Sequence, residues 1–314
     1  MKAAIVDQDR LVELIANRPD VPAGKIEDVE ITHTTIKAGT PVTVVSMRNA
    51  LLMGQQPTTV SFDCELTIRS LGYEGGTWMT DSPQEVWQMA GPLADAHGDV
   101  LVGGLGLGGF THLLHHEPEV IHVTTVERDW RVAELVGRHV DGGCGVVVAD
   151  LFEYLPTVDP GAFDYGFFDI WQPTGELCWQ EFIVPLRRLA RGKIGTLRCW
   201  NESEMWGQLR MALPRVASAA DDMKFEGIMG YYETFRRACK DAGVWEPAID
   251  KGTTDPIGDG LAAELRLREC PEYLALVDLY LDPSHEDWET TFGTHWDATV
   301  TPYLAGRKEE ECRG

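Results

Sequence analysis

The chain has 314 residues, of which 44% are hydrophobic and 25% are charged, a length and composition typical of a globular protein of about two domains. Its 27 Lys and Arg residues face 50 Asp and Glu residues, giving a net charge of −23, and such a field repels phosphate backbones. We therefore expect no nucleic acid partner.

A cluster of basic residues is compatible with this exclusion. Arg187, Arg188, Arg191 and Lys193 lie around Gly192, where a helix is expected to end. Cations at that end complement the carbonyl groups of the last helical turn. We favour this structural interpretation over a nucleic acid patch.

Targeting and redox signals also point to an ordinary intracellular protein. The first twenty residues have no apolar core behind a basic end, and no stretch approaches the ~20 apolar residues of a membrane span. Seven cysteines are scattered without a CxxC pair, which favours reduced thiols. We expect a cytoplasmic protein with no membrane partner. Homo-oligomerisation stays open.

The chain divides into three predicted segments. Residues 1–80 are rich in Thr and Val, as in VEITHTTI and TTVSFDCELTI, and predict short strands and hairpins. In residues 81–201, apolar β-rich runs alternate with helical stretches, which predicts a parallel sheet covered by helices. Residues 202–314 contain helical patterns such as YYETFRRACKDAG and PEYLALVDLYL. The predicted fold class is α/β with a β-rich N-terminus and a mainly helical C-terminal region.

A glycine-rich turn follows the first strand of the central segment. The sequence VLVGGLGLGG starts at Val100 and precedes a helix expected from Phe110 to His116. Glycine lets the backbone approach a ligand, and the helix N-terminus offers free N–H groups. Gly104, Gly106 and Gly108 are the candidate cofactor-binding residues. Because the run fits both GxGxG and GxGxxG, it does not distinguish adenosylmethionine from a dinucleotide.

Acidic residues end the next three predicted strands. Glu127 lies 23 residues after Gly104 and can accept both ribose hydroxyls of an adenosine. Asp150 is placed to take the adenine amino group, and Asp169 ends the following strand. Ligands bind at the carboxyl edge of such sheets. The alternative is that these acids cap the helices that follow them.

Three other features have both a functional and a structural interpretation. Asp81, with Glu85 after it, is either near the pocket or an N-cap of the helix that Pro83 begins. Trp171 either walls the substrate pocket or packs in the core. His112, His115 and His116 are expected on the solvated face of their helix, so no metal site is predicted.

The segment from about Trp78 to Trp200 resembles the class I S-adenosylmethionine-dependent methyltransferases, and within them the spermidine synthase branch. The stretches that carry the resemblance are VLVGGLGLGG, VTTVERD, VVVADLFEYL and FDYGFFDIWQPTGE, and WMTDSPQE is similar to a stretch of spermidine-synthase-like proteins of phages and bacteria. The resemblance implies a Rossmann-like fold. It also implies that Gly104, Gly106, Gly108, Glu127, Asp150 and Leu151 bind S-adenosylmethionine.

The resemblance further implies that Asp169 faces the reacting centre, and we take Asp169, Trp171 and Asp81 as the catalytic candidates. Two departures matter. The acid that spermidine synthases carry inside the glycine loop is Leu107 here, and the second acid of their catalytic segment is Gln172. Fewer carboxylates weaken the binding and deprotonation of a polyamine.

We therefore expect a methyltransferase for a small-molecule or peptide acceptor. The alternatives are aminopropyl transfer from decarboxylated S-adenosylmethionine, an NAD-dependent oxidoreductase, and a non-catalytic binding module.

Overall fold

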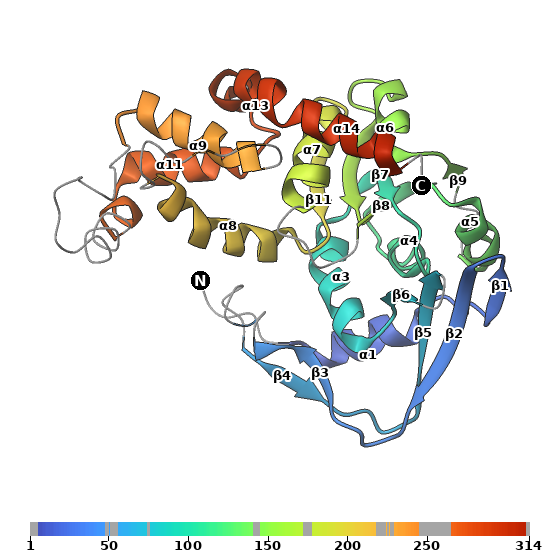
Figure 1. Cartoon of the computed structure of the whole chain (residues 1–314). Coiled ribbons are helices and arrows are strands. Elements are labelled where there is room, and N and C mark those ends of the chain that lie inside the picture. The colour runs from blue at the N-terminus through green and yellow to red at the C-terminus, as the bar shows by residue number, and fades with distance from the viewer. Residues whose placement is uncertain are drawn as a thin grey trace. The chain divides into compact units, whose positions relative to one another are not determined.

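The computed structural model describes residues 6–47, 50, 56–73, 76–140, 145–171, 178–217, 224, 226, 229–244 and 265–311, the last five by their backbone alone. The chain forms two compact units. Unit 1 comprises residues 1–174 and 189–204, and unit 2 comprises residues 175–188 and 205–314. Unit 1 contains the strands, and unit 2 is helical (Figure 1). The segment boundaries at residues 80 and 201 stay predictions.

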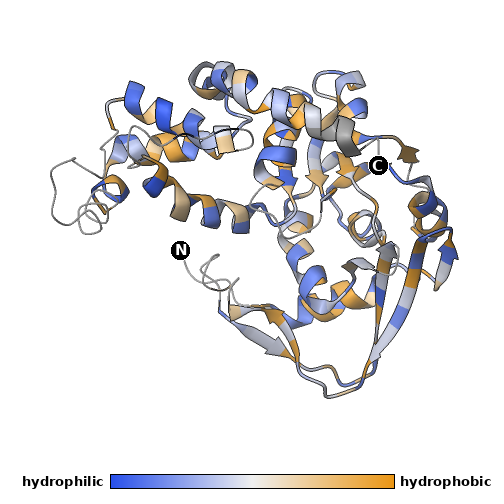
Figure 2. Cartoon of the chain, in the orientation of Figure 1, coloured by the Kyte–Doolittle hydropathy of each residue, from blue (hydrophilic) through white to orange (hydrophobic). Residues whose placement is uncertain are grey.

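The N-terminal part of unit 1 has the predicted strands and hairpins. After helix α1 (Gln8–Ala16), the strands β1 (Gly24–Ile26), β2 (Val29–Ile36), β5 (Leu66–Tyr73) and β6 (Gly76–Thr80) form an antiparallel sheet in the order β1-β2-β5-β6. Strands β3 (Val42–Val45) and β4 (Thr58–Val60) form a separate pair. Val29 and Ile31 of β2 and Leu66, Ile68 and Leu71 of β5 are buried, and hydrophobic segments are visible along both strands in Figure 2.

The central part of unit 1 is a parallel five-stranded sheet. Its order is β11 (Ile194–Cys199), β10 (Phe163–Phe168), β7 (Gly98–Gly103), β8 (Val120–Glu127) and β9 (Gly145–Val148). The helices that precede or follow these strands in the chain are α3 (Pro83–Asp95), α4 (Gly109–Leu114), α5 (Trp130–Val136), α6 (Leu151–Tyr154) and α7 (Val184–Ala190), and most of α7 belongs to unit 2. The predicted α/β, Rossmann-like fold is confirmed.

The strand order fixes where a ligand can bind. The chain runs outward from β7 to β8 and β9, and then crosses back to place β10 on the other side of β7. Such a switch point opens a crevice at the carboxyl ends of the two strands where the order reverses. Gly103 at the end of β7 and Phe168 at the end of β10 are register partners. The residues that follow them therefore lie at this crevice.

An apolar cluster joins the N-terminal sheet to the glycine loop. Leu105 and Leu107 of the loop are 5% and 2% exposed. They belong to a cluster with Ile31 and Leu71 of the N-terminal sheet and Val136 of α5. Burying a leucine side chain stabilises a fold by roughly 1.5–3 kcal/mol. The two leucines therefore anchor the loop, while the glycines between them shape it.

Unit 2 is helical, as predicted for the C-terminal region. It contains most of α8 (Glu202–Ala217), with α9 (Gly230–Asp241), α11 (Pro271–Tyr280), α12 (Glu286–Trp288), α13 (Thr294–Thr299) and α14 (Thr301–Glu311). π-helical turns cover Trp179–Ile183 and Glu289–Gly293. Its core is aromatic, with ring contacts among Phe235, Tyr273, Tyr280, Trp288, Phe292 and Trp296. No helix of the described part of the chain is long and apolar enough to cross a membrane.

The basic cluster around Gly192 is paired in part. Arg188 forms ion pairs with Glu289 and Asp297, both at 2.8 Å, and its guanidinium stacks over Trp288 at 5.4 Å. The Lys193 ammonium donates to the Leu155 carbonyl at 2.6 Å. The helix α7 ends at Ala190 with Arg187 and Arg188 in its last turn, which agrees with the structural interpretation of the cluster.

Candidate active site

The glycine loop has a backbone that other residues rarely adopt. Gly104, Gly106 and Gly108 have φ angles of 92°, 52° and 74°, in the left-handed region that favours glycine. A Cβ on Gly104 would collide with the Asp169 carbonyl oxygen, and one on Gly106 would collide with the Met79 sulfur. The chain's own packing therefore requires glycine at Gly104 and Gly106.

Leu107 faces the apolar cluster that anchors the loop. A carboxylate at this position would be buried among apolar side chains, at a cost of several kcal/mol unless paired. The replacement of the expected acid by leucine thus fits the way this loop is anchored. A cofactor amino group would need a different partner in this protein.

Glu127 ends β8 and organises the backbone around it. Its two carboxylate oxygens accept hydrogen bonds from the Leu105 and Asp129 amides, each at 2.8 Å. The helix α5 that follows is capped by Asp129, whose side chain accepts from the Arg131 amide. The capping interpretation is therefore wrong for Glu127. Each oxygen of a carboxylate has a second lone pair, so ribose hydroxyls can still donate to Glu127.

The capping interpretation is right for Asp150. Its Oδ1 accepts from the Phe152 amide at 2.7 Å at the start of α6. The other oxygen receives no hydrogen bond from the described residues. Leu151 is 3% exposed and packs against Gly103, where a Cβ would collide with it. Asp150 and Leu151 thus lie beside the end of β7.

Asp169 follows β10 and lies next to the glycine loop. Its amide donates to the Gly103 carbonyl at 2.8 Å. No side chain or backbone group of the described residues donates a hydrogen bond to its half-buried carboxylate. Burial, and secondly the charge of Glu85, raise the pKa of Asp169 to about 7. A carboxyl group with this pKa can both accept and release a proton near neutral pH.

Trp171, two residues further on, is 3% exposed. This burial is what packing in the core predicts, and its role as a pocket wall stays a prediction. Gln172, the second departure from the spermidine synthase pattern, lies outside the described residues.

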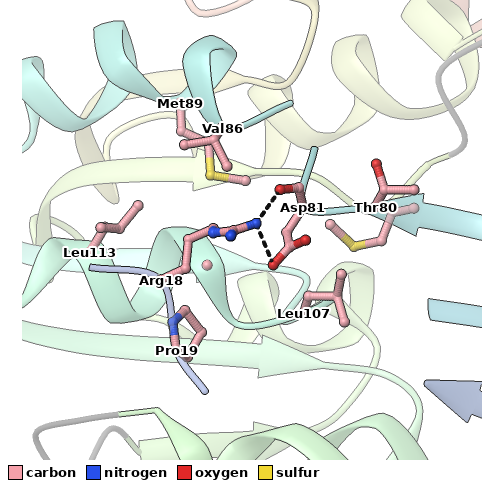
Figure 3. Close-up of a pocket in the computed structure, with 10 residues that line it drawn as sticks. Arg18, Pro19, Thr80, Asp81, Val86, Met89, Leu107 and Leu113 are labelled. Carbon is pink, nitrogen blue, oxygen red and sulfur yellow. Dashed lines mark hydrogen bonds and ion pairs between the residues drawn. The ribbon is translucent and has the colours of Figure 1, made fainter. Parts of the chain in front are cut away.

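Asp81 is held in a buried ion pair. Its carboxylate contacts the guanidinium groups of Arg18 at 2.9 Å and Arg69 at 2.8 Å, and its Oδ1 accepts from the Arg69 amide at 2.6 Å. Figure 3 shows Arg18 reaching both the carboxylate and the carbonyl of Asp81. The N-cap of α3 is Ser82, so the capping interpretation of Asp81 is wrong.

A small cavity lies beside this ion pair. Its volume is about 10 Å³, close to the minimum for one water molecule. Leu107, Gly109 and Leu113 from the glycine loop and α4 line it together with Arg18 and Met79 (Figure 3). It is too small for a cofactor, and Leu107 of the apolar cluster is one of its lining residues.

Glu85 lies in the first turn of α3, and the structure shows contacts of this residue that the sequence did not predict. The Glu85 carboxylate accepts from the Thr80 amide at 3.0 Å and the Thr80 hydroxyl at 2.5 Å. Its charge acts on Asp169. No motif in the sequence connects two acids that are 84 positions apart.

Tyr73 is a second residue that sequence reasoning missed. Its hydroxyl is hydrogen-bonded to Asp129, and burial together with Asp129 and Glu127 raises the pKa of Tyr73. Its ring packs against Trp78, with ring centroids 5.6 Å apart. The end of β5 therefore lies beside the predicted ribose acid.

The prediction for the three histidines is wrong in one position. His112 is 7% exposed and buried, whereas His115 is half-buried and His116 is exposed. The helix α4 is short and packed on more than one side. Within the described ranges, no group of three or more His, Cys, Asp or Glu side chains is arranged to hold a metal ion.

Comparisons with known proteins give a partial likeness. The sequence matches no protein-family model and no curated protein. Spermidine synthase from Thermotoga maritima matches with a TM-score of 0.34 and 16% identity over 46% of this chain and 58% of that chain. A probable spermidine synthase from Corynebacterium glutamicum matches with a TM-score of 0.36 and 13% identity over 61% of this chain and 70% of that one.

A methyltransferase gives a similar result. A SAM-dependent methyltransferase from Archaeoglobus fulgidus matches with a TM-score of 0.26 and 23% identity over 33% of this chain and 42% of that one. The chain thus spans less than two thirds of the length of the Thermotoga and Archaeoglobus proteins. Because these scores are low, the fold assignment rests on the strand order of this chain. Parts of the chain have structural matches among spermidine synthases and SAM-dependent methyltransferases.

Proposed function

We propose that the protein is an S-adenosylmethionine-dependent transferase that methylates a small-molecule or peptide acceptor. The observation that carries the proposal is the position of Asp169. A proton-accepting carboxylate with no donor among the described residues lies against a glycine loop at the switch point of a parallel sheet. This is where doubly wound folds bind their ligands.

The residues at this edge fit the cofactor. Glu127 has lone pairs for two ribose hydroxyls, and Asp150 has one oxygen free of its capping bond for the adenine amino group. Leu151 follows Asp150 at the start of α6, and the loop that contains Gly104, Gly106 and Gly108 would face the methionine part. When bound, S-adenosylmethionine supplies a methyl group that is activated by the positive sulfur.

Asp169 acts as the general base. The acceptor's nucleophile loses a proton as it bonds to the methyl carbon, and the Asp169 carboxylate is positioned to take it. Trp171 limits water near this carboxylate. Asp81, locked to Arg18 and Arg69, fixes the junction between β6 and α3 that carries Thr80 and Glu85, so we assign it a positioning role.

A second candidate is aminopropyl transfer from decarboxylated S-adenosylmethionine. Glu85 favours it, because this side chain is a second carboxylate whose charge acts on Asp169. Two carboxylates can hold the ammonium groups of a polyamine.

The products distinguish the two reactions. The protein is incubated with acceptor mixtures and either S-adenosylmethionine or its decarboxylated form. Release of adenosylhomocysteine shows methyl transfer, and release of methylthioadenosine shows aminopropyl transfer. Asp169→Asn is the matched control that should lose either activity. If neither product forms with any acceptor while the cofactor binds, the non-catalytic alternative holds.

A further inference from the structure

A strained turn of the N-terminal sheet lies beside α5. Glu27 and Asp28 form the two-residue turn between β1 and β2. Glu27 has a φ angle of 54°, a left-handed conformation that glycine or asparagine usually takes in such turns. Strain of this kind persists where neighbouring contacts fix the backbone. At this turn, those contacts are made by the two carboxylates.

Both carboxylates bind Arg131, the second residue of α5. Asp28 forms an ion pair with the guanidinium, and Glu27 lies 3.2 Å from the same nitrogen. The strand that leads into the turn packs on this helix, because a Cβ on Gly24 would be 3.4 Å from the Leu135 side chain. Figure 1 shows β1 beside α5. The turn is therefore held against the helix by both charge and packing.

Arg131 binds Asp129 with the other nitrogens of its side chain. Its Nε and Nη2 donate to the two oxygens of the Asp129 carboxylate at 2.9 and 2.7 Å, and its main-chain amide donates to the same carboxylate at 2.9 Å. The guanidinium also lies over the Tyr73 ring, 6.0 Å from the ring centroid. A two-point pair of this kind fixes the geometry of both side chains. The side chains of Arg131 and Asp129 are only 20% and 16% exposed, which limits competition from water.

Asp129 in turn holds the predicted ribose acid. Its main-chain amide donates to Oε1 of Glu127 at 2.8 Å, and the Leu105 amide donates to Oε2. The direction of the Asp129 amide depends on the backbone of this residue, and the pair with Arg131 restrains that backbone. A continuous chain of contacts therefore runs from the β1–β2 turn through Arg131 and Asp129 to one oxygen of Glu127.

We propose that Arg131 is a positioning residue for ribose recognition: it holds Asp129 between the β1–β2 turn and Glu127, and thereby sets the direction of the Glu127 carboxylate. This inference rests on the transferase function proposed above. A binding site needs its polar groups held within about 0.5 Å of the productive geometry. The N-terminal sheet thus contributes to cofactor affinity through its turn.

The test compares adenosylhomocysteine with its 2′,3′-dideoxy analogue by calorimetry on the full chain. In wild type, loss of the ribose hydroxyls should weaken binding about tenfold or more, because charge-assisted hydrogen bonds are lost. In Arg131→Met, the affinity for adenosylhomocysteine should fall more than the affinity for the analogue, so that their ratio moves toward one. A purely structural loss would weaken both ligands alike. The double variant Glu27→Gln/Asp28→Asn removes the charges of the turn and should shift the ratio in the same direction.

A second measurement needs no ligand. The Asp129 amide hydrogen should exchange with solvent faster in Arg131→Met than in wild type, because its hydrogen bond to Glu127 is held less firmly. Arg138→Met is the matched control, since Arg138 is exposed and donates to the neighbouring His139. It should change neither the exchange rate nor the ligand ratio. Near-ultraviolet circular dichroism checks that each variant is folded.

The outcomes distinguish this inference from the proposed function. If adenosylhomocysteine binds to wild type, an unchanged ligand ratio or an unchanged Asp129 exchange rate in Arg131→Met would overturn the role of Arg131 and leave the transferase in place. If neither adenosylhomocysteine nor S-adenosylmethionine binds to wild type, the transferase fails, and the ribose role of Arg131 fails with it. A lower ratio together with faster exchange would support the inference.

Discussion

The backbone of Asp169 lies against Gly104, with no room for a Cβ between the Asp169 carbonyl oxygen and the loop. The carbonyl oxygen of the preceding glycine, Gly103, accepts a hydrogen bond from the Asp169 amide at 2.8 Å. The candidate base and the candidate cofactor loop are therefore fixed to each other through main-chain atoms. A change at Gly104 should disturb both.

Gly104→Ala should destabilise the protein and abolish cofactor binding. Its φ of 92° and the collision with Asp169 both act against a side chain. The matched control is Gly161→Ala, since Gly161 has a φ of 68° and open space around it. The free energy of unfolding of the control should fall by about 1–2 kcal/mol, which is the usual cost of a side chain in the left-handed conformation. Urea unfolding of both variants gives the comparison, and equal losses would show that the collision is relieved without cost.

Asp169→Asn should raise stability at high pH. The folded pKa of Asp169, about 7, is above the unfolded value of about 3.9. In the wild type, the contribution of protonated Asp169 to the free energy of unfolding is therefore fully present below about pH 4. It is lost as the pH rises through 7. At about 1.4 kcal/mol per tenfold change in proton affinity, the gain of the variant at pH 8 has an upper limit of about 4 kcal/mol.

The measurement is urea unfolding of wild type and Asp169→Asn at pH 4.5 and pH 8. A stability difference that does not grow between these two values would contradict the raised pKa. The same substitution should leave cofactor affinity nearly normal while lowering the single-turnover rate about 10²-fold or more, the usual contribution of a general base.

Asp81→Ala should be strongly destabilising because it leaves Arg18 and Arg69 buried without their shared partner. Breaking a buried pair in this way costs about 3–5 kcal/mol. Asp20→Ala is the control, because Asp20 contacts the same Arg69 from a fully exposed position and exposed pairs contribute about 0–1 kcal/mol. Thermal unfolding of the two variants tests this. If the two variants lost a similar amount of thermal stability, the buried ion pairs of Asp81 would contribute less to stability than their burial indicates.

Glu127→Ala should weaken cofactor binding tenfold or more, since charge-assisted hydrogen bonds contribute about 1.5–3 kcal/mol each. The Glu127 carboxylate also accepts hydrogen bonds from the Leu105 and Asp129 amides. We therefore expect a loss of stability beside the loss of affinity. Calorimetry under conditions where the variant is fully folded separates the two effects. Unchanged affinity there would place the ribose elsewhere.

Local patterns explain why most of the fold was predictable. The Thr- and Val-rich run VEITHTTI forms β2 with the predicted residues, and acids after buried strands mark the carboxyl edge of the central sheet. The site's electrostatics depend on distant residues instead. Arg18 reaches Asp81 across 63 positions, and this contact removes Asp81 from the cap that its sequence position suggested.

Short-range competition decided the remaining differences. Asp81 and Ser82 are both good N-caps, and the ion pair of Asp81 leaves the cap to Ser82. His112 is buried because α4, with only six residues from Gly109 to Leu114, has little exposed surface. Neither outcome follows from helical periodicity alone.

The central claim is that the carboxyl edge of the sheet binds S-adenosylmethionine, and parallel calorimetric titrations test it most directly. S-adenosylmethionine, its decarboxylated form, adenosylhomocysteine and NAD are each titrated into the full chain, and the melting temperature is followed with each ligand. The account predicts that S-adenosylmethionine or adenosylhomocysteine binds and raises the melting temperature, and that Glu127→Ala weakens this binding. Binding of NAD with no binding of any of the three sulfur compounds would contradict it.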